Sequence, residues 1–566
     1  MTYEEFTEKV SSVILTESGN CPVTPVIQML QGKWKLQILY ELCIKSPMRF
    51  GELKKMLKPI TNAALTNALK ELETSELVQR IQYNEMPLRV EYSLTEKGRD
   101  LMPVSFVWGP PMLLLLLGTG VYFTAATRLF QLRHLGLWLR RTLLSCLTGS
   151  ARRQGRAGGV SPFATMCTAL AAAAGTGNIA GVATALTIGG PGAVFWMWVS
   201  AFFGMMTAFA ENVLGMLYRT RGRDGAWQGG PMLYLKKGLH SPGLAGAFAL
   251  CCMLASFGVG NLSQCNSVAD GMAAVFGVPP QATGLVMAAL AAAVLLGGLG
   301  RISRVAETLV PLLSLFYMAG AAAALWCGRA QLAQACGEIF ACAFDWRAGA
   351  GGAAGYGMAQ AIRVGVSRGV FSNEAGMGSS VMVHAAADAK EPCEQGMWAV
   401  FEVFADTIVM CTATALVILS SGAYCGAAGP TGTPLTAAAF SAALGPWGGA
   451  FVAVSLALFA FSSLLGWAYY GQRAAAYLCP RAVPLYKAAY AAAAWAGCVM
   501  RLDLVWALSD VFNGLMALPN LIGVLALRRA VLAEWQRYRR ANHIGQFRPL
   551  SRRHVTQFAQ KSPSSR

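Results

Sequence analysis

Apolar runs of about 20 residues recur along most of the chain, and each is long enough to cross a bilayer as a helix. Charged residues are concentrated in the short segments between these runs. The pattern predicts a mainly α-helical polytopic membrane protein with about eleven transmembrane helices. The predicted spans are residues 106–127, 162–187, 191–217, 244–270, 281–300, 308–326, 355–386, 397–421, 447–471, 485–500 and 505–527.

The first hundred residues follow a different pattern. Apolar residues recur with helical spacing in three stretches, at residues 26–42, 50–57 and 63–72. Thr61 or Asn62 is placed to cap the third of these helices. Residues 78–83 and 89–94 alternate between apolar and polar, as the strands of a hairpin do. Helix, turn, helix and hairpin wing together predict a small α+β DNA-binding domain.

Composition separates the same two units. Only 13% of the residues are charged, against about 25% in a typical soluble domain, and mean hydropathy is +0.45, which excludes an ordinary soluble enzyme. Residues 1–102 carry 13 basic and 13 acidic residues, whereas the remainder carries 33 and 15 and therefore the whole net charge of +18. We expect a domain over 1–103, a membrane domain over 105–530 and a basic tail over 531–566.

Basic residues gather in alternate loops between the predicted spans and in the tail. Because basic loops stay on the cytoplasmic side, the pattern predicts a multi-pass protein of the cell membrane with these loops and the tail in the cytoplasm. An odd number of spans would put the N-terminal domain outside, where DNA binding has no use, and no signal peptide is visible. Three explanations stay open: a miscounted span, a first segment that does not cross, or a gene fusion with little selection on the first domain.

The residues that usually hold cofactors are scattered. None of the fifteen Cys has the C-x2-C spacing of a zinc or redox site, and the five His form no ligand pair. We therefore expect no disulfide framework, no cofactor and no metal other than a coupling ion. No nucleotide-binding loop is present, which argues against an ATP-driven pump, and nothing indicates an enzyme.

Two predicted spans are interrupted by clusters of small and polar residues, Gly175–Gly181 and Phe371–Ser379. Glycine, asparagine and serine disfavour a continuous helix, and unwound backbone is tolerated at membrane depth only inside protein or beside a wet cavity. Matching breaks in two halves of a chain indicate the binding site of an inverted-repeat transporter. The alternative is close helix packing through small residues.

Charged residues within the predicted spans are functional candidates. They are Glu211, Glu374, Glu402, Asp406, Asp510, Arg363 and Arg368. Glu402 and Asp406 lie four residues apart on one helical face. We expect them to pair structurally with Arg363 or Arg368 rather than to bind sodium directly.

Residues 20–103 resemble the HxlR-type winged helix-turn-helix regulators. The resemblance rests on Cys21-Pro-Val, Gly32-Lys-Trp-Lys, Arg49-Phe-Gly-Glu-Leu, Leu69-Lys-Glu-Leu-Glu and Val90-Glu-Tyr-Ser-Leu-Thr-Glu-Lys-Gly. In that family the third helix enters the major groove and the wing touches phosphates. The residues that this places at DNA are Thr61, Asn62, Thr66, Asn67, Lys70 and Arg89. A solvated helix face is the alternative, and Cys21 is either a redox-sensing or a buried structural cysteine.

Residues 105–530 resemble the sodium:alanine symporter family. The motifs that carry the resemblance are Trp108-Gly-Pro-Pro, Gly175-Thr-Gly-Asn-Ile-Ala-Gly-Val, Gly189-Gly-Pro-Gly-Ala-Val-Phe-Trp-Met-Trp, Gly229-Gly-Pro-Met, Arg368-Gly-Val-Phe-Ser-Asn-Glu-Ala-Gly, Phe461-Ser-Ser-Leu-Leu-Gly-Trp and Pro519-Asn. The resemblance implies a LeuT-type core of five plus five inverted helices after one extra helix. It also implies sodium-coupled uptake of alanine or glycine.

The same resemblance implies a substrate site at the two breaks. Backbone N–H groups near Thr176, Gly177 and Asn178 would bind the amino acid's carboxylate, because half-helix N-termini suit anions. Phe371, Ser372 and Asn373 would receive its ammonium group. Two further residues would line the pocket, Gln264 and Trp467, with Trp467 limiting substrate size. Alternatively, Gln264 forms an interhelical hydrogen bond and Trp467 is a packing aromatic.

For sodium, the resemblance implies carbonyls of Ala171 and Ala174 with hydroxyls of Ser462 and Ser463. The family usually has threonine at 463, so the hydroxyl is kept here but the methyl that fixes its rotamer is lost. The leading hypothesis is a sodium symporter of a small neutral amino acid. Two alternatives use the first domain: a membrane-tethered transcription regulator and an amino-acid sensor.

Overall fold

The protein is mainly helical, with a small N-terminal unit of helices and strands followed by a larger helical part. The computed structural model describes residues 34–44, 47–57, 60–74, 77–83, 89–95, 108–147, 160–222, 225–295, 298–344, 354–426, 429–500 and 502–544.

The N-terminal part is a winged helix-turn-helix unit. Its elements are α3 (Lys35–Ile44), β1 (Met48–Arg49), α4 (Phe50–Met56), α5 (Asn62–Thr74), β2 (Val78–Tyr83) and β3 (Arg89–Leu94). The three strands are antiparallel in the order β1-β3-β2, with Val78 opposite Leu94 in the hairpin. Buried aliphatic side chains from all three helices, including Leu39, Leu53 and Leu69, form its core.

The predicted elements of this unit are confirmed wherever the structure describes them. Thr61 caps α5, because its hydroxyl accepts a hydrogen bond from Ala64 N at 3.2 Å. Both hairpin strands have the predicted bounds. The sequence pattern missed β1, whose two residues are too few for an alternation signal. Residues 26–33 and Cys21 lie outside the described residues.

The membrane part contains the following elements in chain order. They are α7 (Pro110–Ala126), α8 (Phe130–Arg133), α9 (Leu135–Arg141), α10 (Leu143–Leu147), α12 (Pro162–Ala173), η1 (Gly177–Gly181), α13 (Val182–Gly189), α14 (Gly192–Leu217), β4 (Thr220–Arg221), β5 (Trp227–Gln228), α15 (Pro231–Lys237), α16 (Pro242–Phe257), η2 (Gly258–Leu262), α17 (Ser263–Phe276), α18 (Pro280–Leu295), α19 (Gly298–Cys327), η3 (Arg329–Gln331), α20 (Leu332–Ala343), α21 (Ala354–Asn373), α22 (Val381–His384), α23 (Pro392–Val403), η5 (Phe404–Cys411), α24 (Thr412–Ser420), α25 (Gly432–Leu444), α26 (Trp447–Leu478), η7 (Pro480–Ala482), α27 (Val483–Val499), α28 (Leu502–Ala526) and α29 (Arg528–Ala541).

Every predicted span coincides with one or more of these helices. Within the described ranges, six helices are long and apolar enough to cross a membrane, and the bent pair α12–α13 makes a seventh. Two shorter apolar helices lie at residues 111–126 and 280–295. The multi-pass character is therefore supported, while the count of eleven spans stays a prediction.

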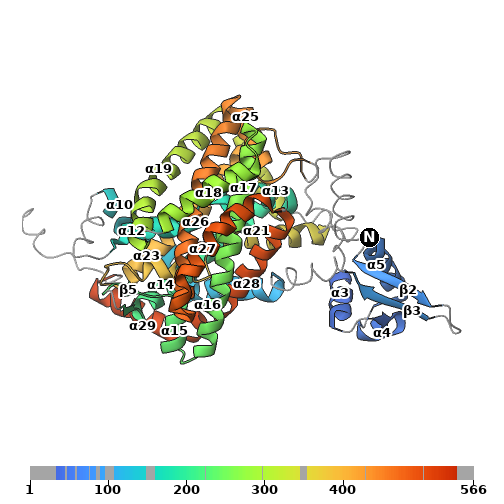
Figure 1. The fold of residues 1–566 in the computed structure, drawn as a ribbon, viewed down its shortest axis with the longest axis horizontal. Coiled ribbons are helices and arrows are strands. Elements are labelled where there is room, and N and C mark those ends of the chain that lie inside the picture. Colours follow the sequence, from blue (N-terminus) through green and yellow to red (C-terminus); the bar gives the residue numbers. More distant parts are fainter. Residues whose placement is uncertain are drawn as a thin grey trace, which may run out of the picture.

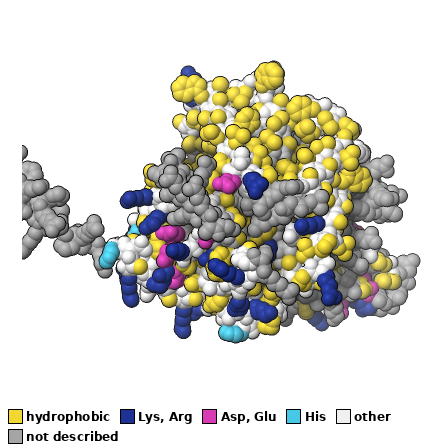
Figure 2. Space-filling view, turned by 60° about the vertical axis from the view of Figure 1, so that its left-hand side comes forward, with side chains coloured by type: hydrophobic (Ala, Val, Ile, Leu, Met, Phe, Trp, Pro, Cys, Tyr) yellow, Lys and Arg dark blue, Asp and Glu magenta, His cyan; other side chains and the backbone are white. Residues whose placement is uncertain are grey.

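The helices from α12 to α28 form one bundle in which segments distant in sequence pack side by side, such as α14 with α21 and α12 with α26 (Figure 1). Large apolar side chains are exposed on its outside, including Leu285 on α18 and Leu315 on α19. Figure 2 shows hydrophobic side chains covering the upper part of one face and Lys and Arg gathered along its lower part. Such a division suits a protein with an apolar belt beside a basic rim.

Both predicted helix breaks are present. The chain bends by 51° between α12 and the η1–α13 segment, after Ala174 takes an extended conformation with ψ of 94°. The second break separates α21 from α22, and Glu374, Gly376 and Gly378 all have positive φ there. A positive φ is costly for a residue with a Cβ atom, so Glu374 is held in this conformation by its surroundings.

Three spans contain a π-helical segment, namely η1, η2 and η5. A π-turn inserts a residue into a helix and frequently marks a functional site. In this chain η1 follows the first break, η2 precedes Gln264 and η5 contains Asp406. All three therefore border the residues described in the next subsection.

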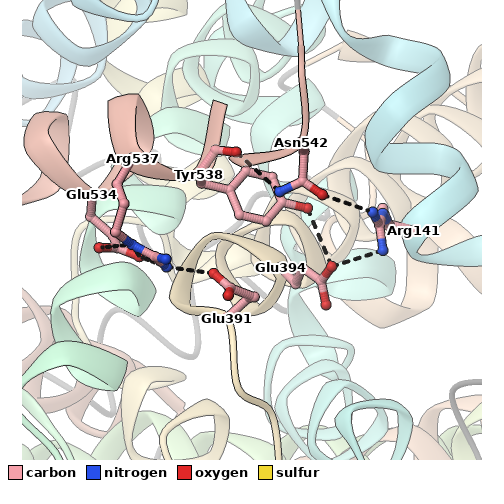
Figure 3. A network of polar contacts seen from close by, with 7 residues as sticks. All are labelled: Arg141, Glu391, Glu394, Glu534, Arg537, Tyr538 and Asn542. Carbon is pink, nitrogen blue, oxygen red and sulfur yellow. Dashed lines mark hydrogen bonds and ion pairs between the residues drawn. The ribbon is translucent and has the colours of Figure 1, made fainter. Parts of the chain in front are cut away.

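The last helix, α29, lies against the bundle through a network of polar contacts (Figure 3). Arg537 forms ion pairs with Glu534 on its own helix at 2.6 Å and with Glu391 before α23 at 2.5 Å. Both carboxylates raise the pKa of Arg537 above its ordinary value. Arg141 at the end of α9 pairs with Glu394 at 2.9 Å, so α9, α23 and α29 are joined.

Apolar contacts hold the other side of α29. The Trp535 ring lies 4.9 Å from that of Phe130 on α8 and 6.2 Å from that of Phe209 on α14, measured between centroids. Trp535, Val531 and Tyr538 are all buried. Because exposed ion pairs contribute little, the buried aromatic face supplies most of the docking energy.

We predict that Trp535→Ala destabilises the protein by about 3–5 kcal/mol, the usual cost of truncating a buried tryptophan. The measurement is the thermal unfolding temperature of the purified protein in detergent. Gln536→Ala is the matched control, since Gln536 is the next residue of α29 and is exposed. Equal unfolding temperatures for the two variants would show that α29 is not docked as described.

Candidate functional site

The two helix breaks meet inside the bundle. A Cβ atom added to Gly177 in the first break would lie 3.0 Å from the Cα of Ser372 in α21. The side chains of Asn178 and Ser372 are both buried. The two segments were predicted to form one site, and the fold brings them into direct contact because neither carries a bulky side chain at the crossing.

Asp406 of η5 lies at this crossing and connects both breaks. Its Oδ1 accepts a hydrogen bond from Asn178 Nδ2 at 2.7 Å, and its Oδ2 accepts one from Ser372 Oγ at 2.7 Å. Thr407 Oγ1 donates to the same Oδ2 at 2.9 Å. Asp406 is completely buried and forms no ion pair in the part of the chain that the structure describes.

Side chains satisfy the backbone of the first break. Gly175 N donates to Asn178 Oδ1 at 3.1 Å, and Thr176 N donates to Gln264 Oε1 at 3.1 Å. These N–H groups, expected to bind a substrate carboxylate, are therefore engaged by amide oxygens of the protein. The Thr176 hydroxyl has no hydrogen-bond partner within the described residues, although it is fully buried.

Other polar groups satisfy the second break. Asn373 Oδ1 accepts from Ala375 N at 3.0 Å, and its Nδ2 donates to Thr407 Oγ1 at 3.1 Å. Asn373 thus supports the break and the neighbouring η5 segment. Buried Glu211 of α14 accepts hydrogen bonds from Gly376 N and from Asn520 of α28.

Asn520 extends this support to two further elements. Its Nδ2 also donates to Gly376 O at 2.9 Å, and its Oδ1 accepts from the Tyr234 hydroxyl of α15. The Glu374 carboxylate accepts a hydrogen bond from Ser379 Oγ at 2.5 Å, across the same break. The break is therefore built from four elements, α14, α15, α21 and α28.

Trp467 lies on α26 where that helix contacts η2. A Cβ atom on Gly260 of η2 would lie 2.2 Å from Trp467 Cβ, so only glycine permits this contact. Trp467 and Phe371 are both nearly fully buried in one hydrophobic cluster. Gln264, from the same helical span as Gly260, accepts from the first break and donates to Val259 O at 3.0 Å.

The four residues expected to bind sodium lie together at the contact of α12 and α26. Ser462 Oγ reaches Ala171 O at 3.4 Å, although it also donates to Phe459 O at 2.8 Å. Ser463 Oγ donates to the carbonyl of Ala172 at 2.6 Å, a residue that the sequence reasoning did not name. The assignment of these residues to sodium stays a prediction.

The expected pairing of the buried charges was wrong. Arg368 forms an ion pair with Asp510 of α28 at 3.2 Å, and not with Glu402 or Asp406. The physical reason is position along α21: Arg368 lies one helical turn before Ser372 on the same face, where α28 is the neighbour, whereas Ser372 reaches η5. Glu402 instead lies 3.0 Å from the imidazole of His384.

The sequence reasoning missed the central place of Asp406 and its neighbours Thr407 and Cys411. Cys411 Sγ lies 3.4 Å from Asn178 Nδ2 and 3.3 Å from Ser372 Oγ. The available signal was an adjacent Asp and Thr in an otherwise apolar span. Among the described residues, no group of three His, Cys, Asp or Glu side chains is arranged to hold a metal ion.

The candidate DNA-binding residues of α5 share one exposed face. Thr61, Asn62, Thr66, Asn67 and Lys70 are exposed, while Leu65, Leu69 and Leu72 of the same helix are buried in the core. Arg89 begins β3.

Comparison with known proteins identifies both parts of the chain. Residues 29–107 match the HxlR-like helix-turn-helix family. Residues 100–551, most of the chain, match the sodium:alanine symporter family. The chain belongs to the sodium:alanine symporter family.

Several relatives of this symporter carry specific names. "Sodium/alanine symporter AgcS" of Methanococcus maripaludis is 45% identical over 437 residues, which cover 76% of this chain and 94% of that protein. "Probable sodium/glutamine symporter GlnT" of Bacillus subtilis is 36% identical over 442 residues, covering 78% and 90%. Among solved structures, MhsT in complex with L-phenylalanine is 15% identical and covers 67% of this chain and 93% of its own, with a TM-score of 0.44.

We predict that Gly177→Ala disrupts the crossing of the two breaks in this symporter. Its Cβ atom would meet Ser372 Cα at 3.0 Å, so backbone must move, and such overpacking typically costs about 1–3 kcal/mol. The measurement is thermal unfolding in detergent. Gly181→Ala is the control within the same η1 segment, because its nearest atom would be Thr176 O at 3.7 Å. If both variants unfold like the unmodified protein, the two breaks are not in contact.

Proposed function

We propose that this protein is a secondary transporter that carries a small neutral amino acid together with sodium across the cell membrane. The observation that carries the proposal is the buried Asp406 carboxylate, which joins two helix breaks and forms no ion pair within the described residues. Burying an ionised carboxylate without a cation is costly. A sodium ion carried as substrate would neutralise it.

The groups around Asp406 suit sodium. Hard cations bind oxygen ligands, and the carboxylate of Asp406 stands beside the hydroxyls of Ser372 and Thr407 and the amide of Asn178. Asn178 and Ser372 belong to different breaks, so an ion bound here would bridge both. This makes Asp406 a proposed sodium ligand, contrary to the structural pairing expected from the sequence.

A second sodium position is proposed at Ala171, Ala174, Ser462 and Ser463. The proximity of Ser462 to Ala171 O supports it. The Ala172 carbonyl, bonded to Ser463, is an additional candidate. A hydroxyl without threonine's methyl rotates more freely at 463, so this position would bind sodium less tightly than one with threonine.

The substrate is proposed to occupy the space at Thr176, Gly177, Gln264, Phe371 and Trp467. Thr176 and Gln264 would exchange their present contacts for the amino acid's carboxylate, since the Thr176 N–H now donates to the amide oxygen of Gln264. The unpartnered Thr176 hydroxyl supports a polar ligand there. The ammonium group would be received by the Ser372–Asn373 segment.

The topology proposed here has eleven spans in a LeuT-type five-plus-five arrangement, with basic loops and tail in the cytoplasm. The matched breaks in α12 and α21 and the basic rim support it. A membrane-tethered regulator and an amino-acid sensor are not favoured as the function, because most of the chain matches a family of symporters. DNA contact by the α5 face is kept as a proposal for the N-terminal domain alone.

We expect Asp406→Asn to abolish sodium-driven uptake of alanine into proteoliposomes, because the amide removes the negative charge that would balance the ion. Asp270→Asn is the matched control, since Asp270 is an exposed aspartate of α17. Correct insertion is checked by size-exclusion profile and unfolding temperature. Sodium dependence that survives in Asp406→Asn would remove Asp406 from the ion site.

We also expect Trp467 to set the upper size of the substrate. In the unmodified protein alanine and glycine should compete for uptake whereas leucine and phenylalanine should not, because a filled pocket rejects larger side chains by overpacking. Trp467→Ala should admit leucine, and Trp495→Ala, an exposed tryptophan of α27, is the control. Leucine that competes as well as alanine in the unmodified protein would contradict both the size limit and the small-substrate assignment.

A further inference from the structure

A second buried polar cluster lies outside the proposed sodium and substrate positions. It consists of Thr165 of α12, His384 of α22, and Gln395 and Glu402 of α23, which we call the His384 cluster. All four side chains are at least 98% buried. The cluster therefore joins the beginning of the first interrupted helix to the segment after the second break.

Hydrogen bonds connect the four residues in a row. Gln395 Nε2 lies 3.1 Å from Thr165 Oγ1 and 2.6 Å from His384 Nδ1, and His384 Nε2 lies 3.0 Å from Glu402 Oε2. Thr165 donates its own hydroxyl proton to Pro162 O at 2.9 Å, so it accepts from Gln395. With the amide in this orientation, Gln395 donates to Nδ1 and the imidazole carries its proton on Nε2.

This arrangement leaves two buried oxygens without a partner. Within the described residues, Glu402 Oε1 and Gln395 Oε1 form no hydrogen bond. A neutral imidazole that donates to an ionised carboxylate leaves one negative charge in a dry site, which is energetically unfavourable. One added proton neutralises that charge and can be held by one of these two oxygens.

The surroundings of the cluster are mostly acidic or neutral. The titratable and charged groups that face it are Glu211 of α14, Glu374 of the second break, Asp406 of η5, Tyr470 of α26 and Arg219 at the end of α14. Arg219 donates to the carbonyls of Ala385 and Ala387 just after His384, at 3.4 and 2.7 Å. Its charge is thus bound to backbone carbonyl groups.

We propose that the His384–Glu402 pair binds one exchangeable proton that is taken up when α12, α22 and α23 pack together and released when they separate. The proton comes from water, is held on Glu402 Oε1 beside the neutral imidazole, and returns to water. No other bond changes. This inference rests on the proposed transport function, because only a transport cycle would separate these helices.

A proton fits this cluster better than a second sodium ion. Two unpartnered oxygens are too few for a cation that needs several oxygen ligands, and the imidazole contributes nitrogen. Thr165 lies three residues after the start of α12. Any movement of α12 away from α23 therefore breaks the hydrogen bond from Gln395 to Thr165, and this couples helix movement to proton binding.

The test is sodium-driven alanine uptake by the full chain in proteoliposomes between about pH 6 and 9, a range in which histidine-linked groups titrate. Uptake should fall by about ten-fold per pH unit on the alkaline limb, because a single required proton is lost. Glu402→Gln keeps the shape of the protonated acid, so its uptake should stay within about two-fold over the same range. Glu402→Asp should restore the pH dependence, and Glu338→Gln on α20 is the control.

A Glu402→Gln variant that keeps the alkaline fall, or unmodified protein with uptake independent of pH, would overturn the proposal. A second measurement does not require transport. Infrared difference spectra of the purified unmodified protein between the two pH limits should show a carboxylic acid band, shifted by Glu402→Asp. A protein without sodium-driven uptake that shows this band would fail the proposed function but keep the proton site, and absence of the band would remove the proton site alone.

Discussion

The structure depends on one constraint: backbone polar groups released by a helix break at membrane depth must find partners inside the protein. The first break meets it with the amide oxygens of Asn178 and Gln264. The second meets it with Asn373, Glu211 and Asn520. Each partner comes from a different helix or lies in the break itself, so satisfying the breaks also fixes how α14, α17 and α28 pack around them.

The buried carboxylates divide by their neighbours. Glu211 accepts from backbone and Asn520, and thereby serves the break, whereas Asp510 has Arg368 as an ion-pair partner. Asp406 has only neutral donors and Glu402 has a histidine. Neutral donors favour the ionised form of a carboxylate without cancelling its charge, so Asp406 is the residue suited to a cation. Glu402 has an imidazole beside it, and this pair is suited to binding a proton.

Much of the fold could be predicted because apolar length, hairpin alternation and small-residue clusters are local signals. The wing strands have the predicted bounds, and the breaks at Gly175–Gly181 and Phe371–Ser379 lie where the sequence placed them. The partners of the charges could not be predicted, because they depend on which neighbouring helix lies beside each turn. Arg368 and Ser372 lie four residues apart in α21, yet one reaches Asp510 and the other Asp406.

The junction of the two units indicates that the proposed transport and the proposed DNA contact are separable. The two family matches overlap only at residues 100–107, so they occupy separate parts of the chain. The alignment with the AgcS relative covers 94% of that protein but only 76% of this chain. Residues 1–102 have no net charge, whereas the rest carries +18, so the two units also differ in charge. The argument for the transport site therefore does not depend on the side of the membrane on which the N-terminal domain lies.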